Sequence, residues 1–195
     1  MRGLHDFYRA LAERFAEVGI DAIAVDYFGR TAGPGRREDP FDFRHHADRT
    51  TADGVTADVD AAVRYLRSPD GGGVRSVWTV GFCFGGGHSW RLAADLDGLD
   101  GAVGFYGRPS LAAGVIGRTH APLLLLVAGA DEQIPIADVT AFADAVRDAG
   151  GSAECVVYAD APHSFFDRTS AEHRAACDDA WSRIVGFMDR TRASS

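Results

Sequence analysis

The sequence contains no apolar run that approaches the roughly 20 residues needed to cross a bilayer, which excludes a helical membrane protein. Basic side chains are outnumbered: 20 Lys and Arg residues stand against 28 Asp and Glu residues, so the net charge is −8 and the pI about 5.3. Nucleic acids and anionic membranes both select proteins with a basic face. We therefore expect neither as a partner and predict small-molecule ligands.

Cysteine is also scarce, with three residues in 195. An odd number without pairable spacing predicts reduced thiols rather than a disulfide framework. Residues 1–15 have the pattern of an amphipathic helix with acidic side chains, unlike a secretory signal peptide. These features predict a cytoplasmic protein. The length fits a single domain over residues 1–195 that buries its core without disulfides or metals.

Helical and strand patterns alternate along the chain. Apolar residues at helical spacing, together with the segment after a Gly-rich turn, predict helices over residues 4–18, 55–66, 86–96, 136–146 and 177–188. Short apolar runs predict strands over residues 20–26, 76–80, 101–106, 122–128 and 153–158. Ser170 is the expected cap of the last helix, and the long segment 27–51 is an expected irregular loop in a site wall. The alternation predicts a three-layer α/β fold with a mostly parallel sheet.

Residues 76–87, SVWTVGFCFGGG, have the pattern of a strand, a tight turn with Cys83 at its apex, and the start of a helix. Such a nucleophile elbow holds the apex side chain exposed beside backbone N–H groups, and glycines around it allow close backbone approach. Two alternative interpretations of this stretch are that Cys83 is a buried structural cysteine and that the turn is a phosphate-binding loop. The dinucleotide pattern G-x-G-x-x-G is absent, because Cys83 stands where its second glycine would be.

Ligands of parallel α/β folds lie at the carboxyl ends of the strands, so residues that act together should follow strands. Cys83, Asp131 and His163 each follow a predicted strand, in the order nucleophile, acid, histidine. A thiol needs an imidazole to activate it and a carboxylate to orient that imidazole. Asp131 alone could be a turn residue and His163 a loop residue, but the joint pattern favours a triad. Cys155 and Cys177 lie on a strand and a helix face, where core packing explains them better.

Three sequence features together resemble the dienelactone hydrolases, a family within the α/β-hydrolase fold. They are GFCFGG around Cys83, the spacing from Asp131 to Pro135, and APHSF around His163. The resemblance covers almost the whole chain. It implies a cofactor-independent hydrolase of lactones or esters that works through a thiol and a thioester intermediate. The backbone N–H of Phe84, directly after the nucleophile, is the oxyanion donor that this sequence can supply.

The resemblance also implies residues that bind the substrate. Arginines hold the substrate's carboxylate in this family, and the segment DYFGR places one of them at Arg30. The second family arginine falls at Asp167, so neighbouring Arg168 is a weak candidate, and a carboxylate-bearing substrate is an expectation that this departure puts in doubt. Tyr106, at a strand end, is a further candidate to line the pocket. The alternative for Arg30 is an exposed loop charge.

The histidines outside this set do not suggest a metal site. His45 and His46 are adjacent and lack the spacing and the accompanying ligands of a zinc site, so we expect no metal. His88 lies on the helix after the elbow, where a packing role is expected. The incomplete arginine pattern leaves a second function open, that of a non-catalytic protein that binds a small molecule on a hydrolase scaffold.

The chain opens on a helix, whereas the resemblance implies a preceding strand between the strands that end at Asp26 and Val80. We therefore expect an N-terminally truncated form of the fold, with Met1 as an internal methionine of a longer product. The absent segment would carry an acidic residue that helps activate the thiol, and the second oxyanion donor would fall at about Met1. Loss of a central strand should weaken both stability and catalysis, because unpaired buried backbone groups are costly.

Overall fold

A computed structural model describes residues 3–37 and 40–192 of the chain. The chain forms two compact units, Met1–Val74 and Arg75–Ser195, and each is described by itself. The second unit carries the sheet and the residues after each of its strands. The single domain predicted over residues 1–195 stays a prediction.

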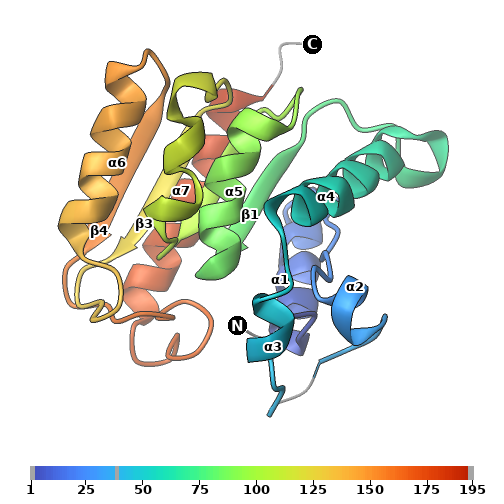
Figure 1. The fold of residues 1–195 in the computed structure, drawn as a ribbon, viewed down its shortest axis with the longest axis horizontal. Helices are drawn as coiled ribbons and strands as arrows, with labels where there is room; N and C mark the ends of the chain where they lie inside the picture. Colours follow the sequence, from blue (N-terminus) through green and yellow to red (C-terminus); the bar gives the residue numbers. More distant parts are fainter. Residues whose placement is uncertain (1–2, 38–39, 193–195) are drawn as a thin grey trace. The chain divides into compact units, whose positions relative to one another are not determined.

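The second unit contains a four-stranded sheet in the order β1-β2-β3-β4, with every neighbouring pair parallel. Its strands and helices, most of them labelled in Figure 1, are β1 (Trp78–Phe82), α5 (Phe84–Asp95), β2 (Gly101–Phe105), η2 (Pro109–Leu111), η3 (Ala113–Arg118), β3 (Leu123–Ala128), α6 (Ile136–Asp148), β4 (Ala153–Tyr158) and α7 (Arg174–Thr191). Every residue of β2 and β3 is buried, as expected for strands covered on both faces. This arrangement confirms the predicted α/β fold with a parallel sheet.

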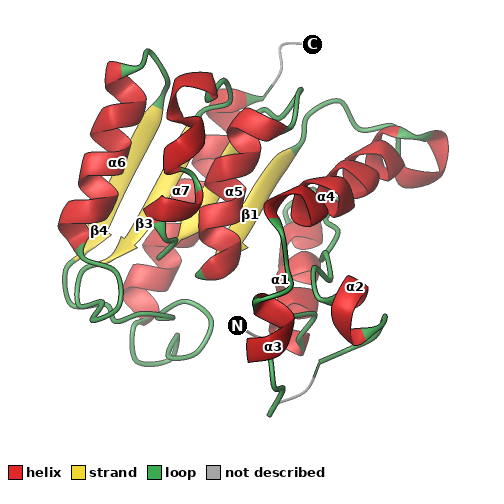
Figure 2. Ribbon diagram, viewed as in Figure 1, coloured by secondary structure: helices red, strands yellow, loops and turns green. Residues whose placement is uncertain are grey.

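Helices cover both faces of this sheet. A Cβ built on Gly101 would lie 2.6 Å from Phe187 of α7, and one built on Gly104 would collide with Trp90 of α5. Because side chains alternate between faces along a strand, these two glycines face opposite sides. Figure 2 shows α5 and α6 in front of the strands and α7 behind them. The close helix contacts at both positions explain why glycine stands there.

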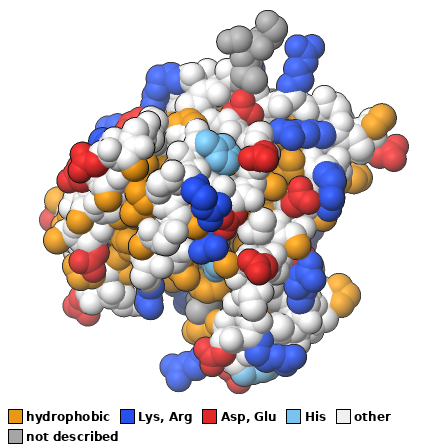
Figure 3. All heavy atoms as spheres, turned by 45° about the horizontal axis from the view of Figure 1, so that its top comes forward, with side chains coloured by type: hydrophobic (Ala, Val, Ile, Leu, Met, Phe, Trp, Pro, Cys, Tyr) orange, Lys and Arg blue, Asp and Glu red, His pale blue; other side chains and the backbone are white. Residues whose placement is uncertain are grey.

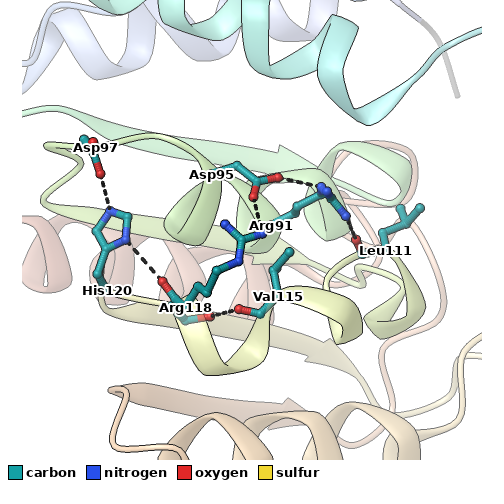
Figure 4. A network of polar contacts seen from close by, with 8 residues as sticks. Arg91, Asp95, Asp97, Leu111, Val115, Arg118 and His120 are labelled. Carbon is teal, nitrogen blue, oxygen red and sulfur yellow. Dashed lines mark hydrogen bonds and ion pairs between the residues drawn. The ribbon is translucent and has the colours of Figure 1, made fainter.

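A polar network joins the end of α5 to the connection that follows β2. Asp95 pairs with Arg91 one turn earlier on the same helix, at 2.7 Å, and with Arg118 of η3, at 3.1 Å (Figure 4). Arg91 also donates to the carbonyl of Leu111 at 3.4 Å. Arg91 and Asp95 therefore tie η2 and η3 to α5, the helix that begins directly after Cys83.

The first unit is helical in the residues described. It comprises α1 (Asp6–Glu17), α2 (Gly29–Ala32), α3 (Arg44–Ala47), α4 (Ala52–Arg67) and η1 (Pro69–Gly71). The imidazole of His5 caps α1 by accepting the N–H of Phe7, and the Thr51 hydroxyl caps α4 by accepting the N–H of Gly54. Its buried apolar side chains are Leu11, Phe15, Phe28, Val55 and Val63.

Most predicted elements are confirmed, but three expectations about local structure are wrong. Residues 20–26 form no strand, and Ile23 is 40% exposed. An apolar run becomes a strand only when a neighbour completes its hydrogen-bond ladder, and among the described residues none pairs with this segment. The final helix starts at Arg174 rather than after Ser170, because residues 169–173 form a turn closed on the Thr169 carbonyl.

The third difference lies in the segment 27–51, which contains the short helices α2 and α3 rather than only irregular loop. Its expected place in a site wall stays a prediction. No helix in residues 3–37 or 40–192 is long and apolar enough to cross a membrane. Basic and acidic side chains are interspersed on the face drawn in Figure 3, in keeping with a surface that carries both signs of charge.

Candidate active site

Cys83 occupies the turn between β1 and α5 with an unusual backbone, φ 54° and ψ −113°. Its N–H donates to the Phe105 carbonyl at 3.0 Å, and its own carbonyl accepts the N–H of Gly86 at 3.0 Å. A Cβ on Gly86 would lie 2.6 Å from the same Phe105 carbonyl oxygen. The turn thus presses the start of α5 against the end of β2, which confirms why the elbow is rich in glycine.

Asp131 and His163 form a direct pair. The Nδ1 of His163 lies 2.7 Å from Oδ2 of Asp131, whose side chain is 2% exposed. The other oxygen of Asp131 accepts the backbone N–H groups of Gln133, at 2.8 Å, and Ile134, at 3.2 Å. Both carboxylate oxygens therefore have donors, and the acid is fixed in an orientation that favours a proton on Nδ1 of the imidazole.

Cys83 interacts with the same histidine. Burial raises the pKa of the Cys83 thiol, the hydrogen bond and charge of His163 are the largest effects that lower it, and the net pKa is below its usual value. Burial lowers the pKa of His163, but its bonds to Cys83 and Asp131 raise it by more. Opposite shifts of this kind favour a thiolate paired with an imidazolium.

The topology explains how residues 80 positions apart meet. The strands run parallel, so Cys83 after β1, Tyr106 after β2, Asp131 after β3 and His163 after β4 all follow the same edge of the sheet. The sequence predicted that Cys83, Asp131 and His163 each follow a strand, and each lies directly or shortly after a strand of this sheet. The arrangement has the groups needed for nucleophilic attack with proton transfer: a thiol, an imidazole and an orienting carboxylate.

Backbone strain is concentrated around this edge. Within residues 3–37 and 40–192, the non-glycine residues with positive φ are Cys83 (54°), Tyr106 (35°) and Ser164 (65°). Each adopts a conformation that L side chains rarely occupy, and such strain clusters at functional sites. Ser164 directly follows His163, and serine, unlike glycine, is not a residue type that indicates a positive φ.

Tyr106 is buried, with 2% of its surface exposed, and its ring centroid lies 5.0 Å from that of His163. Its hydroxyl donates to Oδ1 of Asp167 at 2.6 Å. Sequence reasoning noted Asp167 only as the residue at an expected arginine position and missed this hydrogen bond. Arg168 is exposed, and its backbone N–H bonds the Ser164 carbonyl at 2.9 Å.

Arg30 belongs to the first unit, where Asp58 holds its guanidinium. The Nε of Arg30 lies 2.9 and 3.0 Å from the two Asp58 oxygens, and one terminal nitrogen lies 2.7 Å from Oδ1. The arginine side chain is 57% exposed. Its role as a substrate ligand stays a prediction, and the second oxyanion donor expected at about Met1 lies outside the described residues.

The remaining histidines and cysteines have other surroundings. The ring of His88 packs edge-on against Phe84 at 4.4 Å, and burial followed by the charge of Arg91 lowers the pKa of His88 to about 4. His46 stacks on Phe41 at 5.4 Å. All three cysteines are free thiols. Burial raises the pKa of Cys155, whereas the Cys177 thiol is buried and donates to the Phe165 carbonyl at 3.6 Å.

Comparisons with known proteins agree with this arrangement. The model of the "Dienelactone hydrolase family" matches residues 1–192. An Escherichia coli K12 protein named "Putative carboxymethylenebutenolidase" is 31% identical over 95% of this chain and 72% of its own length. A Saccharolobus solfataricus protein of the same name is 27% identical over 96% of this chain and 85% of its own length.

A crystal structure titled "Putative Dienelactone Hydrolase", from Klebsiella pneumoniae, matches with a TM-score of 0.83 and 28% identity. The match covers 96% of this chain and 82% of that one. These comparisons lead to one assignment. The family model spans nearly the whole chain, the relatives share one name, and the solved structure is of the same family. The chain belongs to the dienelactone hydrolase family, has the α/β-hydrolase fold, and is by class a hydrolase of esters or lactones.

Proposed function

We propose that this protein cleaves a small lactone or carboxylic ester through Cys83, His163 and Asp131, with a thioester intermediate. The observation that carries the proposal is the position of His163, which is hydrogen-bonded to Asp131 at 2.7 Å and interacts with the Cys83 thiol. A low thiol pKa beside a raised imidazole pKa supplies the nucleophile and the proton donor together.

In the first half-reaction the Cys83 sulfur attacks the carbonyl carbon, and the carbonyl oxygen becomes an oxyanion. The N–H of Phe84 points toward the Cys83 sulfur and starts α5, so it is the proposed donor to this oxyanion. His163 then gives its proton to the departing alkoxide oxygen as the carbon–oxygen bond breaks. A thioester and an alcohol result, and in a lactone the alcohol stays attached to the acyl group.

In the second half-reaction a water molecule attacks the thioester carbonyl while neutral His163 takes its proton. The carbon–sulfur bond breaks, a carboxylic acid forms, and the sulfur leaves as the thiolate that pairs with the imidazolium again. Asp131 keeps the Nδ1 proton in place throughout. The sum is one ester and one water converted to one acid and one alcohol.

The substrate's charge is the finer part of the proposal. Arg30 is the proposed ligand of a substrate carboxylate, and Tyr106 and Arg168 are further candidates for contact with the substrate. In an acidic protein an arginine near a pocket would favour a small anion, since the net charge of −8 opposes large polyanions. The Arg30 guanidinium is already paired with Asp58, so a substrate carboxylate must share the guanidinium with Asp58 or displace Asp58 from it. We also propose that residues 1–195 act as one catalytic module in the cytoplasm.

Replacement of the nucleophile tests the function. Cys83→Ala should abolish turnover of small lactones and esters, whereas Cys155→Ala, which removes a free thiol of raised pKa from β4, should keep it. Electrospray mass spectrometry after a rapid quench should show an acyl group on Cys83 of the wild-type protein. Turnover that is unchanged in Cys83→Ala would refute the proposal.

The alternative is a non-catalytic protein that binds a small molecule on the same scaffold. It is favoured by the departure from the family's arginine pattern at Asp167. Brief treatment with iodoacetamide separates the two, because an activated thiol reacts faster than ordinary ones. Modification of Cys83 well before Cys155 and Cys177 supports the hydrolase, and equally slow modification of all three supports the binding protein.

A further inference from the structure

Tyr106 combines features that ordinary core packing does not require. It is a non-glycine residue at φ 35°, it is 2% exposed, and it directly follows β2. Its N–H donates to the Leu126 carbonyl at 2.8 Å, which ties this strained residue to β3. A backbone held in such a conformation by the sheet points its side chain in a fixed direction. That direction is toward the segment that carries His163.

Three contacts join the Tyr106 side chain to that segment. The ring lies 5.0 Å from the imidazole of His163, centroid to centroid, and 5.7 Å from the ring of Phe165. The hydroxyl donates to Asp167 at 2.6 Å, a short bond to a carboxylate. Tyr106 therefore touches the segment at His163 and again four residues later. The ring limits where the imidazole can move, and the hydroxyl limits where the segment can move.

We propose that Tyr106 is a positioning residue for His163 and that Asp167 acts through it, as the anchor of the Tyr106 ring. Asp131 fixes one ring nitrogen of His163, and the interaction with Cys83 requires that the imidazole also keep a defined tilt about that bond. The Tyr106 ring limits departures from this tilt, and the bond to Asp167 fixes the ring. The other imidazole nitrogen then stays directed at Cys83. The inference rests on the proposed function, since it concerns the same histidine.

This role differs from contact with the substrate, and the kinetic consequences differ too. A residue that positions the general acid and base changes kcat, whereas a residue that binds the substrate equally in ground and transition states changes KM. Loss of the hydroxyl in Tyr106→Phe should lower kcat about 3- to 10-fold at unchanged KM, the effect of one lost hydrogen bond. It should also move the pH profile of Cys83 alkylation toward higher pH, because a displaced imidazole stabilises the thiolate less.

The chain offers a matched control in Tyr158, whose hydroxyl donates to Asp179 at 2.8 Å and whose ring also packs against Phe165, at 5.2 Å. Tyr158→Phe removes the same kind of bond from the same unit without touching His163. It should leave kcat and the alkylation profile as in the wild-type protein. A merely structural role for Tyr106 would lower the melting temperature of both variants and move neither profile.

Variants of Asp167 test the anchor. Asp167→Ala should shift the alkylation profile in the same direction as Tyr106→Phe, and the double variant should lose no more than the more affected single one, because both remove the Tyr106–Asp167 hydrogen bond. Asp167→Asn keeps an acceptor oxygen and should keep more of the rate than Asp167→Ala. Losses that multiply in the double variant, or a change in KM with an unshifted alkylation profile, would overturn the proposal.

The alkylation profile separates this inference from the proposed function. It reports thiolate formation at Cys83 and needs no turnover, so it can be measured even if no ester or lactone is cleaved. If the wild-type protein cleaves nothing but Tyr106→Phe and Asp167→Ala shift the profile equally, the proposed function fails and the positioning role holds. If turnover depends on Cys83 but neither variant differs from Tyr158→Phe, the positioning role fails and the function holds.

Discussion

Replacement of Asp131 by asparagine removes a charge while it preserves shape, and its effect follows from the contacts of the two carboxylate oxygens. One oxygen accepts the N–H groups of Gln133 and Ile134, and the other faces Nδ1 of His163. The asparagine oxygen will keep the two backbone donors, which leaves its NH2 group facing the imidazole. His163 must then accept at Nδ1 and carry its proton on the nitrogen that faces Cys83. That tautomer cannot take a proton from the thiol.

The magnitude follows from the lost bond. A hydrogen bond to a charged group contributes about 1.5 to 3 kcal/mol, which corresponds to about a 10- to 150-fold loss in kcat/KM. Asp131 raises the pKa of His163, so its removal should also move the alkaline limb of the kcat/KM profile to lower pH, because the imidazolium is lost earlier. The acid limb depends on the Cys83 thiol, and a weaker imidazolium should move it to higher pH. The pH range of activity should narrow from both sides.

The assay is the pH dependence of kcat/KM with one small ester. Asp160→Asn is the matched control, because it makes the same substitution at an exposed aspartate in the turn just before His163. It should leave both limbs in place. An Asp131→Asn enzyme with wild-type kcat/KM and an unshifted alkaline limb would refute the assignment of Asp131 as the acid.

Two further predictions concern other contacts. Asp58→Asn should free the Arg30 guanidinium and lower KM for an acidic lactone about two- to fivefold. Arg30→Met should raise KM for the same lactone. Equal effects on KM for a neutral ester of similar size would refute the role of Arg30. Gly86→Ala should lower the melting temperature by roughly 2 to 10 °C, because its Cβ would lie 2.6 Å from the Phe105 carbonyl oxygen and 3.0 Å from the Cα of Gly107. Gly85→Ala on the same turn of α5 has nothing within 4 Å and should melt no lower than the wild type; equal melting of the two variants would contradict the close approach.

The sequence predicts the second unit well because its signals are local and physical. Leu123–Ala128 is apolar at every position, and a strand buried on both faces needs that composition. Residues 20–26 carry a similar pattern yet form no strand. The pattern reports only how the side chains would be accommodated, whereas a strand also requires a neighbouring backbone to pair with, and a single sequence does not show where that neighbour is.

The same distinction between local signals and tertiary pairing applies to the candidate site. Cys83, Asp131 and His163 could be placed together because each follows a strand, and parallel strands end at one edge. The bond from Tyr106 to Asp167 could not be placed, since it depends on a turn through Ser164 at φ 65° and on the direction of a side chain after β2. A serine carries no signal for positive φ, in contrast to the glycines of the elbow.

The strained residues also suggest how stability and activity are connected in this protein. Cys83, Tyr106 and Ser164 each occupy a backbone conformation that costs about 1 to 3 kcal/mol and persists only where neighbours hold it. For the first two the neighbours are carbonyls of the adjacent strand, since Cys83 bonds Phe105 and Tyr106 bonds Leu126. The nucleophile and the residue beside its histidine therefore depend on one ladder across β1, β2 and β3. A substitution that loosens β2 should relax both at once, so that activity falls before the fold is lost.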